Sequence, residues 1–333
     1  MQRRLGRCAG GVVEGWPSVV HVDTSTQWRG GQVQLLLLAR GMAARGAEVG
    51  VACPEGSPMW EALAAVPEVV RIAVPAGRSL RTPPILAGLP ADLLAAHTSH
   101  AHELCAVLSR PLVVHRRVDF RPSGGWKYRR PQAFVAVSEA VARIVRQAGG
   151  REVHVVYDGV APLPAAAPAP DGPTVLAVGA RVPHKGHRYL AQACALLPGI
   201  DVGIAGEGPL LYPGPRWLDQ RPDVPALLAA ARVFVHPSVE EGMGQVVVEA
   251  MLAGVPVVCT DAGGLPEVVG DTGIVVPRAD AGALARAILQ VLAGEHPPVE
   301  AARQRAAARF SVQAMVEGSL RVYAAVAAAA GRG

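Results

Sequence analysis

Short runs of β-branched residues alternate with longer helical patterns along most of the chain, and this alternation constrains the fold more than any other feature. It is typical of parallel strands joined by helices, because each parallel strand needs a long crossover before the next can pair with it. We predict two series of strands: Val19–Ser25, Glu48–Pro54, Val69–Val74, Asp92–His97, Leu112–Arg116, Phe134–Ser138 and His154–Asp158, then Thr174–Gly179, Asp201–Gly206, Arg232–Pro237, Pro256–Thr260 and Ile274–Val276.

The two series are separated by Ala161–Pro173, APLPAAAPAPDGP, whose prolines cannot donate to a sheet and stiffen the chain. We therefore predict two doubly wound α/β domains, residues 1–160 and 174–310, joined by a linker over 161–173. Residues 311–333 are expected to hold a C-terminal helix that packs back on the first domain. The helix is predicted over Ser311–Ala329 by apolar residues at near-helical spacing, namely Met315, Leu320, Tyr323 and Val326.

The composition excludes several classes of protein. With 50% hydrophobic and 18% charged residues the chain is too apolar for a disordered protein, and 4% aromatic residues argue against a stacking platform for nucleic acid. The five cysteines lie far apart without a CxxC pair, which argues against a disulfide framework and a zinc site and indicates a reducing compartment. Because no uninterrupted apolar run reaches about 18 residues, we expect a cytoplasmic protein whose only membrane contacts are peripheral.

The stretch with the most chemical information is Pro237–Gly254, PSVEEGMGQVVVEAMLAG, which follows a predicted strand and opens into a helix. Gly242 and Gly244 leave the backbone N–H groups of the turn open, and a helix N-terminus adds partial positive charge. This turn, with Met243 between the glycines, therefore suits an anion such as a diphosphate.

Two carboxylates flank the turn at a spacing of eight residues, Glu241 before it and Glu249 inside the helix. Carboxylates do not bind phosphate, but they accept hydrogen bonds from the hydroxyls of a sugar or a ribose. The alternative is a capping glutamate followed by a solvated helical glutamate. The Gly–x–Gly turn between the two favours the sugar interpretation.

Two cations follow another predicted strand in Val178–Gly186, VGARVPHKG. Arg181 and Lys185 lie where they could reach a diphosphate at the Gly242–Gly244 turn. Of 32 lysines and arginines only Lys127 and Lys185 are lysines, so a compact point charge at position 185 indicates a phosphate contact. The alternative is a pair of solvated loop cations.

Near the amino terminus Asp23–Gln34, DTSTQWRGGQVQ, joins a strand end to a helix through Gly30 and Gly31, which allow close approach of a ligand. Neither this turn nor Gly206–Leu211, GEGPLL, has the GxGxxG fingerprint of dinucleotide-binding proteins. The chain also lacks a DxD pair, the usual sign of a metal-bridged diphosphate. We expect neither a cofactor nor a metal.

The segment His97–His102, HTSHAH, begins at a predicted strand end. Three imidazoles so close together could ligate a metal, but Glu103 is the one nearby carboxylate at a suitable spacing. We therefore favour a strand-end His97 that contacts a bound sugar, with His115 at the end of the next strand as a second candidate.

A basic segment, His115–Pro131, holds six cations against Asp119 alone, together with Trp126 and Tyr128. The net charge of the whole chain is +5, so this segment accounts for the excess of positive charge. It fits an anionic acceptor or a lipid surface. A solvated loop in an arginine-rich protein explains it equally well.

These motifs resemble the retaining glycosyltransferases of family 4. EGMGQVVVEA is similar to the E-x7-E motif of the family, VGARVPHKG to its donor-phosphate segment and IAGEGP to its nucleotide-contacting loop. In the first half, WRGGQVQLLLLARGMAARGAEV, AVSEAVARIV and VVYDGV are similar to first-domain segments. The resemblance covers about Val19 to Ala329, with the motifs in family order.

The resemblance implies a GT-B fold, in which two Rossmann-like domains face a central cleft, with the acceptor mainly in the first and a nucleoside diphosphate sugar mainly in the second. It also implies transfer with retention and no obligatory metal. Carried over by position, Arg181 and Lys185 would stabilise the leaving diphosphate, while Glu249 would hold the ribose. Glu241 and the backbone of Gly242–Gly244 would hold the donor sugar and its phosphate.

By the same resemblance, Gly206 and Glu207 would contact the nucleotide, Gly30–Gly31 would close over the diphosphate, and His97 would lie near the transferred sugar. The basic segment fits a cell-envelope glycan or lipid-linked acceptor and a peripheral position on the inner face of the cytoplasmic membrane. The family has a helix after Gly208, where this chain has only PLLYPGP, so we expect the nucleotide-base side to be trimmed.

Two other functions stay open. A nucleotide-sugar epimerase can use the same fold, although the E-x7-E motif and the basic segment count against it. A nucleotide-sugar-binding or scaffold protein that has lost transfer is the other, although intact Arg181, Lys185, Glu241 and Glu249 count against that.

Overall fold

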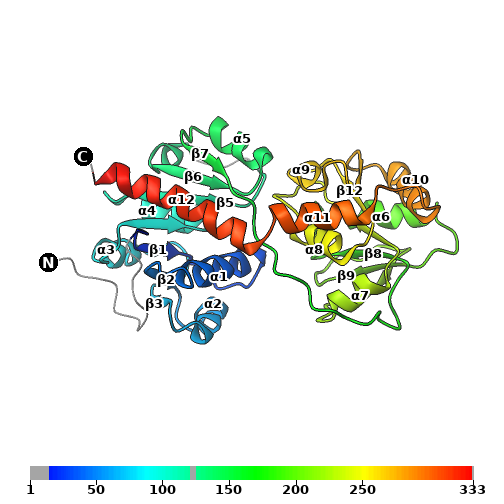
Figure 1. Cartoon of the computed structure of the whole chain (residues 1–333), viewed down its shortest axis with the longest axis horizontal. Coiled ribbons are helices and arrows are strands. Elements are labelled where there is room, and N and C mark those ends of the chain that lie inside the picture. The colour runs from blue at the N-terminus through cyan, green and yellow to red at the C-terminus, as the bar shows by residue number, and fades with distance from the viewer. Residues whose placement is uncertain (1–14, 121–124, 332–333) are drawn as a thin grey trace. The chain divides into compact units, whose positions relative to one another are not determined.

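The computed structural model describes residues 15–120 and 125–331 (Figure 1). The chain forms two compact units: unit 1 comprises Met1–Gly159 and Val312–Gly333, and unit 2 comprises Val160–Ser311. The proline-rich segment 161–173 belongs to unit 2 rather than standing apart as a linker. Within it the Ala169 N–H donates to the Ala226 carbonyl oxygen at 3.0 Å.

Unit 1 is built on a seven-stranded parallel sheet in the order β3-β2-β1-β4-β5-β6-β7. Its strands are β1 Val19–Val22, β2 Val49–Cys53, β3 Val70–Ala73, β4 Leu93–Ala96, β5 Leu112–Arg116, β6 Ala133–Ala136 and β7 Val153–Val155. The helices are α1 Gly30–Ala43, α2 Pro58–Ala62, α3 Thr82–Ala87, α4 Ser99–Ala106, α5 Glu139–Gln147 and α12 Val312–Ala330, with short 3-10 turns η1 Leu63–Ala65 and η2 Trp126–Arg129.

Unit 2 is built on a six-stranded parallel sheet in the order β10-β9-β8-β11-β12-β13. Its strands are β8 Val175–Val178, β9 Val202–Ala205, β10 Arg216–Trp217, β11 Val233–His236, β12 Val257–Thr260 and β13 Ile274–Val276. The helices are α6 His187–Cys194, α7 Val224–Ala230, α8 Gln245–Ala253, α9 Leu265–Val269, α10 Ala281–Leu292 and α11 Val299–Arg309, with the 3-10 turn η3 Pro183–Lys185.

The predicted fold class is confirmed, and each of the twelve predicted strands overlaps an observed one. The strand that the sequence did not reveal is β10, because its two residues follow Pro215 and form no apolar run. The terminal helix is also present as α12. Its Met315, Leu320 and Tyr323 are buried in the core of unit 1, where α12 lies beside α1 (Figure 1).

The strand order reverses once in each sheet, at β1 and β4 in unit 1 and at β8 and β11 in unit 2. In open α/β sheets such reversals leave a crevice at the carboxyl ends of the strands, because the two flanking connections leave on opposite faces, and ligands bind there. The segments that follow β1, β4, β8 and β11 hold most of the predicted site residues. The fold therefore gathers them at two places, one in each unit.

Candidate functional site

In unit 2 the segments after β8 and β11 pack directly on each other. Gly186 has a φ of +67°, and a Cβ atom there would lie 1.9 Å from the Pro237 carbonyl oxygen, so only glycine fits. The Val239 N–H also donates to the His184 carbonyl oxygen at 2.8 Å. These contacts hold the loop that carries Lys185 against the loop that carries Glu241.

One oxygen of Glu241 is the centre of a buried polar cluster. Glu241 Oε2 lies 2.5 Å from Lys185 Nζ, 2.7 Å from His236 Nε2 and 3.3 Å from Ser238 Oγ. Burial alone would raise the pKa of Glu241, but the hydrogen bond from His236 and the charge of Lys185 together hold that pKa well below its usual range. Burial also lowers the pKa of His236. At neutral pH the cluster therefore holds a carboxylate and a lysine ammonium.

His236 was not among the predicted site residues. The signal available in the sequence was a histidine that ends a buried strand five residues before Glu241, in FVHPSVEEG. Its second role is structural, because its ring lies 6.3 Å from that of Phe234 in a stacked arrangement.

Glu249, the other carboxylate of the motif, is in a different state. It lies in α8, is half-buried, and has no hydrogen-bond or ion-pair partner in the described part of the chain. Burial raises its pKa to about 7. A half-buried carboxylate without a partner is unfavourable unless a ligand supplies donors, and the hydroxyls of a ribose are such donors.

Arg181 and the glycine loop after β9 form the next part of this edge. Arg181 donates from Nε to the Gly208 carbonyl oxygen and from a terminal nitrogen to Asp219 Oδ1, both at 2.9 Å. Its guanidinium lies 5.7 Å from the ring centre of Trp217. A Cβ at Gly206 would come within 2.0 Å of the Gly179 carbonyl oxygen, so the glycine is required for this packing. Glu207, between the two glycines, is exposed.

The predicted anion turn ends where α8 begins. Met243 is buried, and Gly244 has a φ of +90° with Leu265 only 2.6 Å from the place a Cβ would occupy. Gly242 is buried as well. The turn therefore has a fixed shape, and it places the N-terminal end of α8 at the same sheet edge as Lys185.

In unit 1 the segment after β1 is shaped by a buried carboxylate. Asp23 accepts hydrogen bonds from the Gln32 side-chain nitrogen at 2.7 Å and from the Ser25 N–H at 2.8 Å. Gln32 in turn accepts one from the Arg29 N–H at 3.1 Å. A Cβ at Gly31 would meet no atom within 4 Å, so the fold itself does not require glycine there.

His97 is half-buried and contacts two buried histidines, His21 and His115, rather than lying at a free strand end. Its Nδ1 is 3.0 Å from Arg117 and its Nε2 is 2.9 Å from His21 Nδ1. A guanidinium can only donate, so His97 Nδ1 accepts and His97 Nε2–H donates to His21. Both ring nitrogens are therefore occupied, and a hydrogen bond between His97 and a sugar would require Arg117 or His21 to move.

His115 stacks on His97 with ring centres 4.4 Å apart, and its Nε2 lies 2.5 Å from the Tyr323 hydroxyl of α12. Burial, reinforced by nearby charged or polar groups, holds the pKa values of His97 and His115 well below their usual range, so both rings are neutral. His115 thus offers a ligand little accessible surface. His100 is exposed and His102 is bonded to the Lys127 carbonyl oxygen, so the HTSHAH histidines do not converge.

The basic segment is less basic at its surface than its sequence suggests. Arg116 is buried and donates to backbone oxygens, Arg117 pairs with Asp158, and Lys127 is buried against Ser99 and Glu103, so three of the cations serve the fold. Arg129 and Arg130 are exposed, and Arg121 lies outside the described residues.

Two family models match the chain, one over each half. The model for Glycosyltransferase Family 4 matches residues 28–162, and the model for Glycosyl transferases group 1 matches residues 172–294. The chain belongs to the family 4 glycosyltransferases. The two models therefore match the two halves of the chain, in the order that the motifs predicted.

Two of the relatives are named for the synthesis of lipopolysaccharide core and O-antigen. The lipopolysaccharide core biosynthesis glycosyltransferase LpsE of Rhizobium meliloti is 30% identical over 225 residues, which is 61% of this chain and 66% of the relative. The O-antigen chain mannosyltransferase B of Escherichia coli is 39% identical over 140 residues, 35% of this chain and 36% of the relative. The matches thus span about a third to two thirds of the relatives.

Among solved structures, that of Anabaena Alr3699/HepE in complex with UDP superposes with a TM-score of 0.78 at 22% identity and covers 92% of this chain and all of that one. A sucrose-phosphate synthase of Thermosynechococcus elongatus reaches 0.75 at 18% identity, with 94% and 100% covered. These likenesses establish the GT-B fold. In the part of the chain that the structure describes, no helix is long and apolar enough to span a membrane.

Proposed function

We propose that the protein transfers a sugar from a nucleoside diphosphate sugar to a hydroxyl group of a cell-envelope glycan or glycolipid. The observation that carries this proposal is the edge of unit 2 where Arg181 and Lys185 follow β8, Lys185 pairs with Glu241, and the two motif carboxylates are in opposite states. Glu241 is ionised and paired, whereas Glu249 is half-buried without a partner. The two cations could bind a diphosphate anion, and the carboxylate of Glu249 could accept hydrogen bonds from the hydroxyls of a ribose.

The chemistry follows from these charges. The bond between the anomeric carbon and the diphosphate breaks, a bond to the acceptor oxygen forms on the same face, and the acceptor proton passes to the departing phosphate oxygen. Negative charge grows on the diphosphate, where Lys185, Arg181 and the N–H groups at the start of α8 would stabilise it. Lys185 would then exchange part of its contact with Glu241 for the phosphate, which leaves Glu241 free to accept a sugar hydroxyl.

This proposal assigns the acceptor to unit 1. Gly31, which the fold does not require as glycine, would allow the α1 N-terminus to approach the diphosphate. The exposed Phe120, Trp126 and Arg129 of the basic segment would bring unit 1 to an anionic lipid surface on the cytoplasmic side of a membrane. Flotation with phosphatidylglycerol vesicles tests this contact. Trp126→Ala should reduce the bound fraction, and exposed Leu80→Ala should not.

The experiment for the main proposal combines candidate nucleotide sugars with lipid-linked and free glycan acceptors and follows the products by proton NMR. The expected result is a new glycoside whose anomeric configuration matches that of the donor, formed in excess EDTA. An inverted product would reject retention. An epimerised nucleotide sugar without any glycoside would favour the epimerase alternative.

A further inference from the structure

Unit 2 has a concavity beside the short connection between β9 and β10. These strands are parallel and pair Gly203 with Arg216. Neighbouring parallel strands are normally joined by a crossover of a dozen or more residues, usually a helix. When successive strands follow one another in the same direction across the sheet, their right-handed crossovers lie on the same face of it. Here residues 206–215 make the connection without a helix. The side of α6 that such a helix would cover is therefore open.

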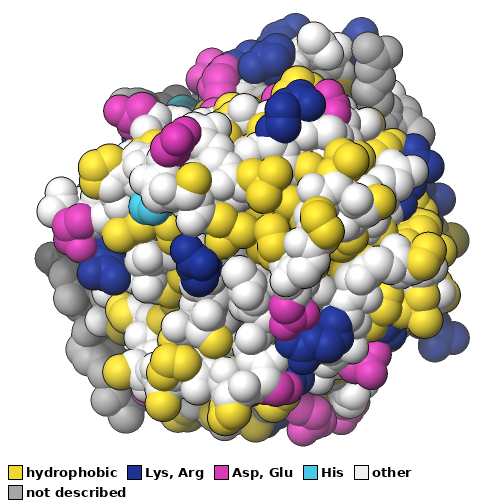
Figure 2. All heavy atoms as spheres, turned by 90° about the vertical axis from the view of Figure 1, so that its right-hand side faces the viewer, with side chains coloured by type: hydrophobic (Ala, Val, Ile, Leu, Met, Phe, Trp, Pro, Cys, Tyr) yellow, Lys and Arg dark blue, Asp and Glu magenta, His cyan; other side chains and the backbone are white. Residues whose placement is uncertain are grey.

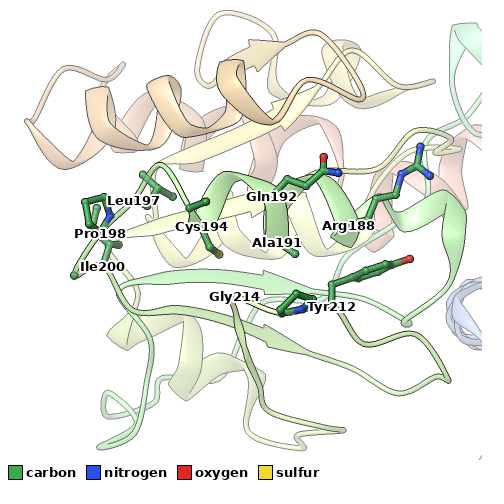
Figure 3. A pocket seen from close by; sticks show the side chains of 12 residues that line it. Arg188, Ala191, Gln192, Cys194, Leu197, Pro198, Ile200, Tyr212 and Gly214 are labelled. Carbon is green, nitrogen blue, oxygen red and sulfur yellow. The ribbon is translucent and has the colours of Figure 1, made fainter.

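The resulting slot has a volume of about 760 Å³, within the range of small-molecule sites. Small side chains, Ala191 and Cys194, line its middle (Figure 3). The two ends differ in polarity: Arg188 and Tyr212 extend toward one end, while the other is apolar and is formed by Leu197, Pro198 and Ile200 (Figure 3).

The wall of the slot opposite α6 is held in place. The Trp217 indole N–H donates to the Tyr212 carbonyl oxygen at 3.1 Å, which ties the connection to β10. The slot is therefore formed without a ligand, and a ligand would not have to order this wall when it binds.

The surroundings of the slot are apolar as well. Leu196 and Leu211, each next to slot residues in the chain, are 53% and 60% exposed. On the side of the molecule turned to the viewer in Figure 2, hydrophobic side chains gather across the middle, with charged groups scattered around them. An apolar chain that enters the slot would lie near exposed Leu196 and Leu211.

Arg188 gives the polar end its charge. It is exposed, its guanidinium lies 4.4 Å from the Tyr189 ring centre, and no carboxylate in the described residues forms an ion pair with it. The slot thus combines an unpaired cation and a phenol at one end with an apolar surface at the other. That combination complements an anionic head group attached to an apolar chain.

We propose that this slot binds a single-chain amphiphile with an anionic head, of the fatty-carboxylate class. The carboxylate pairs with Arg188 and the Tyr212 hydroxyl, and the chain lies along Ala191 and Cys194 toward Leu197. The inference does not rest on the proposed function, because binding is measured without turnover.

Cys194 provides a local reporter, since it lines the slot and is partly exposed, whereas Cys53, Cys105 and Cys259 are buried. The probe is decanoate below its critical micelle concentration, and the readout is the rate of Cys194 alkylation by peptide mass spectrometry. Decanoate should slow the alkylation at least about tenfold, acetate should not, and decanol should bind about tenfold to a hundredfold more weakly because it lacks the charge. Arg188→Gln should remove the preference for decanoate over decanol.

A second variant tests the place of binding by calorimetry. Ala195→Phe fills the slot from its exposed rim and should abolish decanoate binding without a change in melting temperature, whereas the exposed Ala229→Phe on α7 should bind like the wild type. Unchanged alkylation of Cys194 at saturating decanoate, or undiminished binding to a folded Ala195→Phe variant, would overturn the proposal. Equal affinity for decanol and decanoate would reject the anionic head.

Discussion

The two sheet edges where the strand order reverses differ in the charge of the side chains that line them. At the β8–β11 edge of unit 2, charged groups lie close together, and the side chain of Lys185 is 20% exposed. At the β1–β4 edge of unit 1, three neutral histidines lock one another in place, with Arg117 and Asp158 paired beside them. The same topology thus gives one edge lined by charged side chains, which we propose binds an anion, and one lined by neutral histidines that contact one another.

The glycines at the two edges differ in whether the fold requires them. Gly186, Gly206 and Gly244 in unit 2 have positive φ and no room for a Cβ, so the fold requires them. Gly31 in unit 1 has neither constraint. The packing therefore explains the three glycines of unit 2, whereas Gly31 is left for another role, such as the close approach of a ligand.

The largest expected effect concerns the charge at the unit 2 edge. Lys185→Gln should lower turnover roughly a hundredfold to a thousandfold, as loss of one stabilising group for a developing oxyanion does elsewhere. The fold should persist, because His236 still donates to Glu241. Steady-state kinetics measure the effect, with Arg286→Gln, an exposed cation on α10, as the control. Unchanged turnover in the variant would remove Lys185 from the mechanism.

Lower pH should destabilise unit 1 more than unit 2. His21, with a pKa lowered by burial to about 3, and His97 and His115 stay neutral when folded but take up protons near pH 6.5 when unfolded. Protons that bind only the unfolded state destabilise the fold, so unit 1 should lose roughly 1.4 kcal/mol per histidine for each pH unit below about 6.5.

Unit 2 holds two histidines with lowered pKa values, His187 and His236, but it should respond less than unit 1, because Glu249 acts in the opposite direction. Its raised pKa means that the folded state binds the extra proton between about pH 4.5 and 7, so acidification over this range favours folding. Hydrogen exchange of each unit at pH 7 and pH 5.5, corrected for the intrinsic rates, measures the difference. Equal loss of protection in both units would contradict it.

The contrast between glycines predicts two different stability effects. Gly186→Ala should cost about 3 kcal/mol or more, since it adds both backbone strain and a clash with Pro237. Gly31→Ala should be neutral or stabilise α1 by about 0.5–1 kcal/mol and still impair nucleotide binding. Urea unfolding together with nucleotide titration separates these outcomes, and a destabilised Gly31→Ala variant would show that the glycine serves the fold.

The last effect concerns Glu249. Glu249→Gln should stabilise the ligand-free protein by up to about 3 kcal/mol at pH 8, where the buried carboxylate is ionised, and by almost nothing at pH 4.5. Nucleotide affinity should fall at the same time. Thermal unfolding at the two pH values measures it, and a variant less stable than the wild type at pH 8 would mean that the carboxylate has a partner in the fold.

The sequence predicted the sheets because their strands are short, strongly apolar and bounded by glycine or proline. It did not predict β10, whose pairing depends on its place beside β9 rather than on its own two residues. The E-x7-E carboxylates, Arg181 and Lys185 were predicted to lie at one edge, and the structure places them along the carboxyl ends of β8 and β11 or on α8.

The partners of these side chains could not be predicted. Lys185 meets Glu241 only because Gly186 lets two loops pack. His97 is held because β1 and β5 bring His21 and His115 to it, and Tyr323 of α12 bonds to His115. Such contacts join residues distant in sequence. The basic segment shows the same limit, since its pattern could not reveal that Lys127 is buried against Glu103.

The most direct test of the central claim is a calorimetric titration of UDP, GDP, ADP and dTDP into the wild type and into Lys185→Gln, each in excess EDTA. We predict that one of the four binds the wild type clearly more tightly than the others, without metal, and that Lys185→Gln weakens that binding at least about tenfold. Absence of binding by all four to the folded wild type would contradict the assignment of the β8–β11 edge as a nucleotide-sugar site and would favour a scaffold protein.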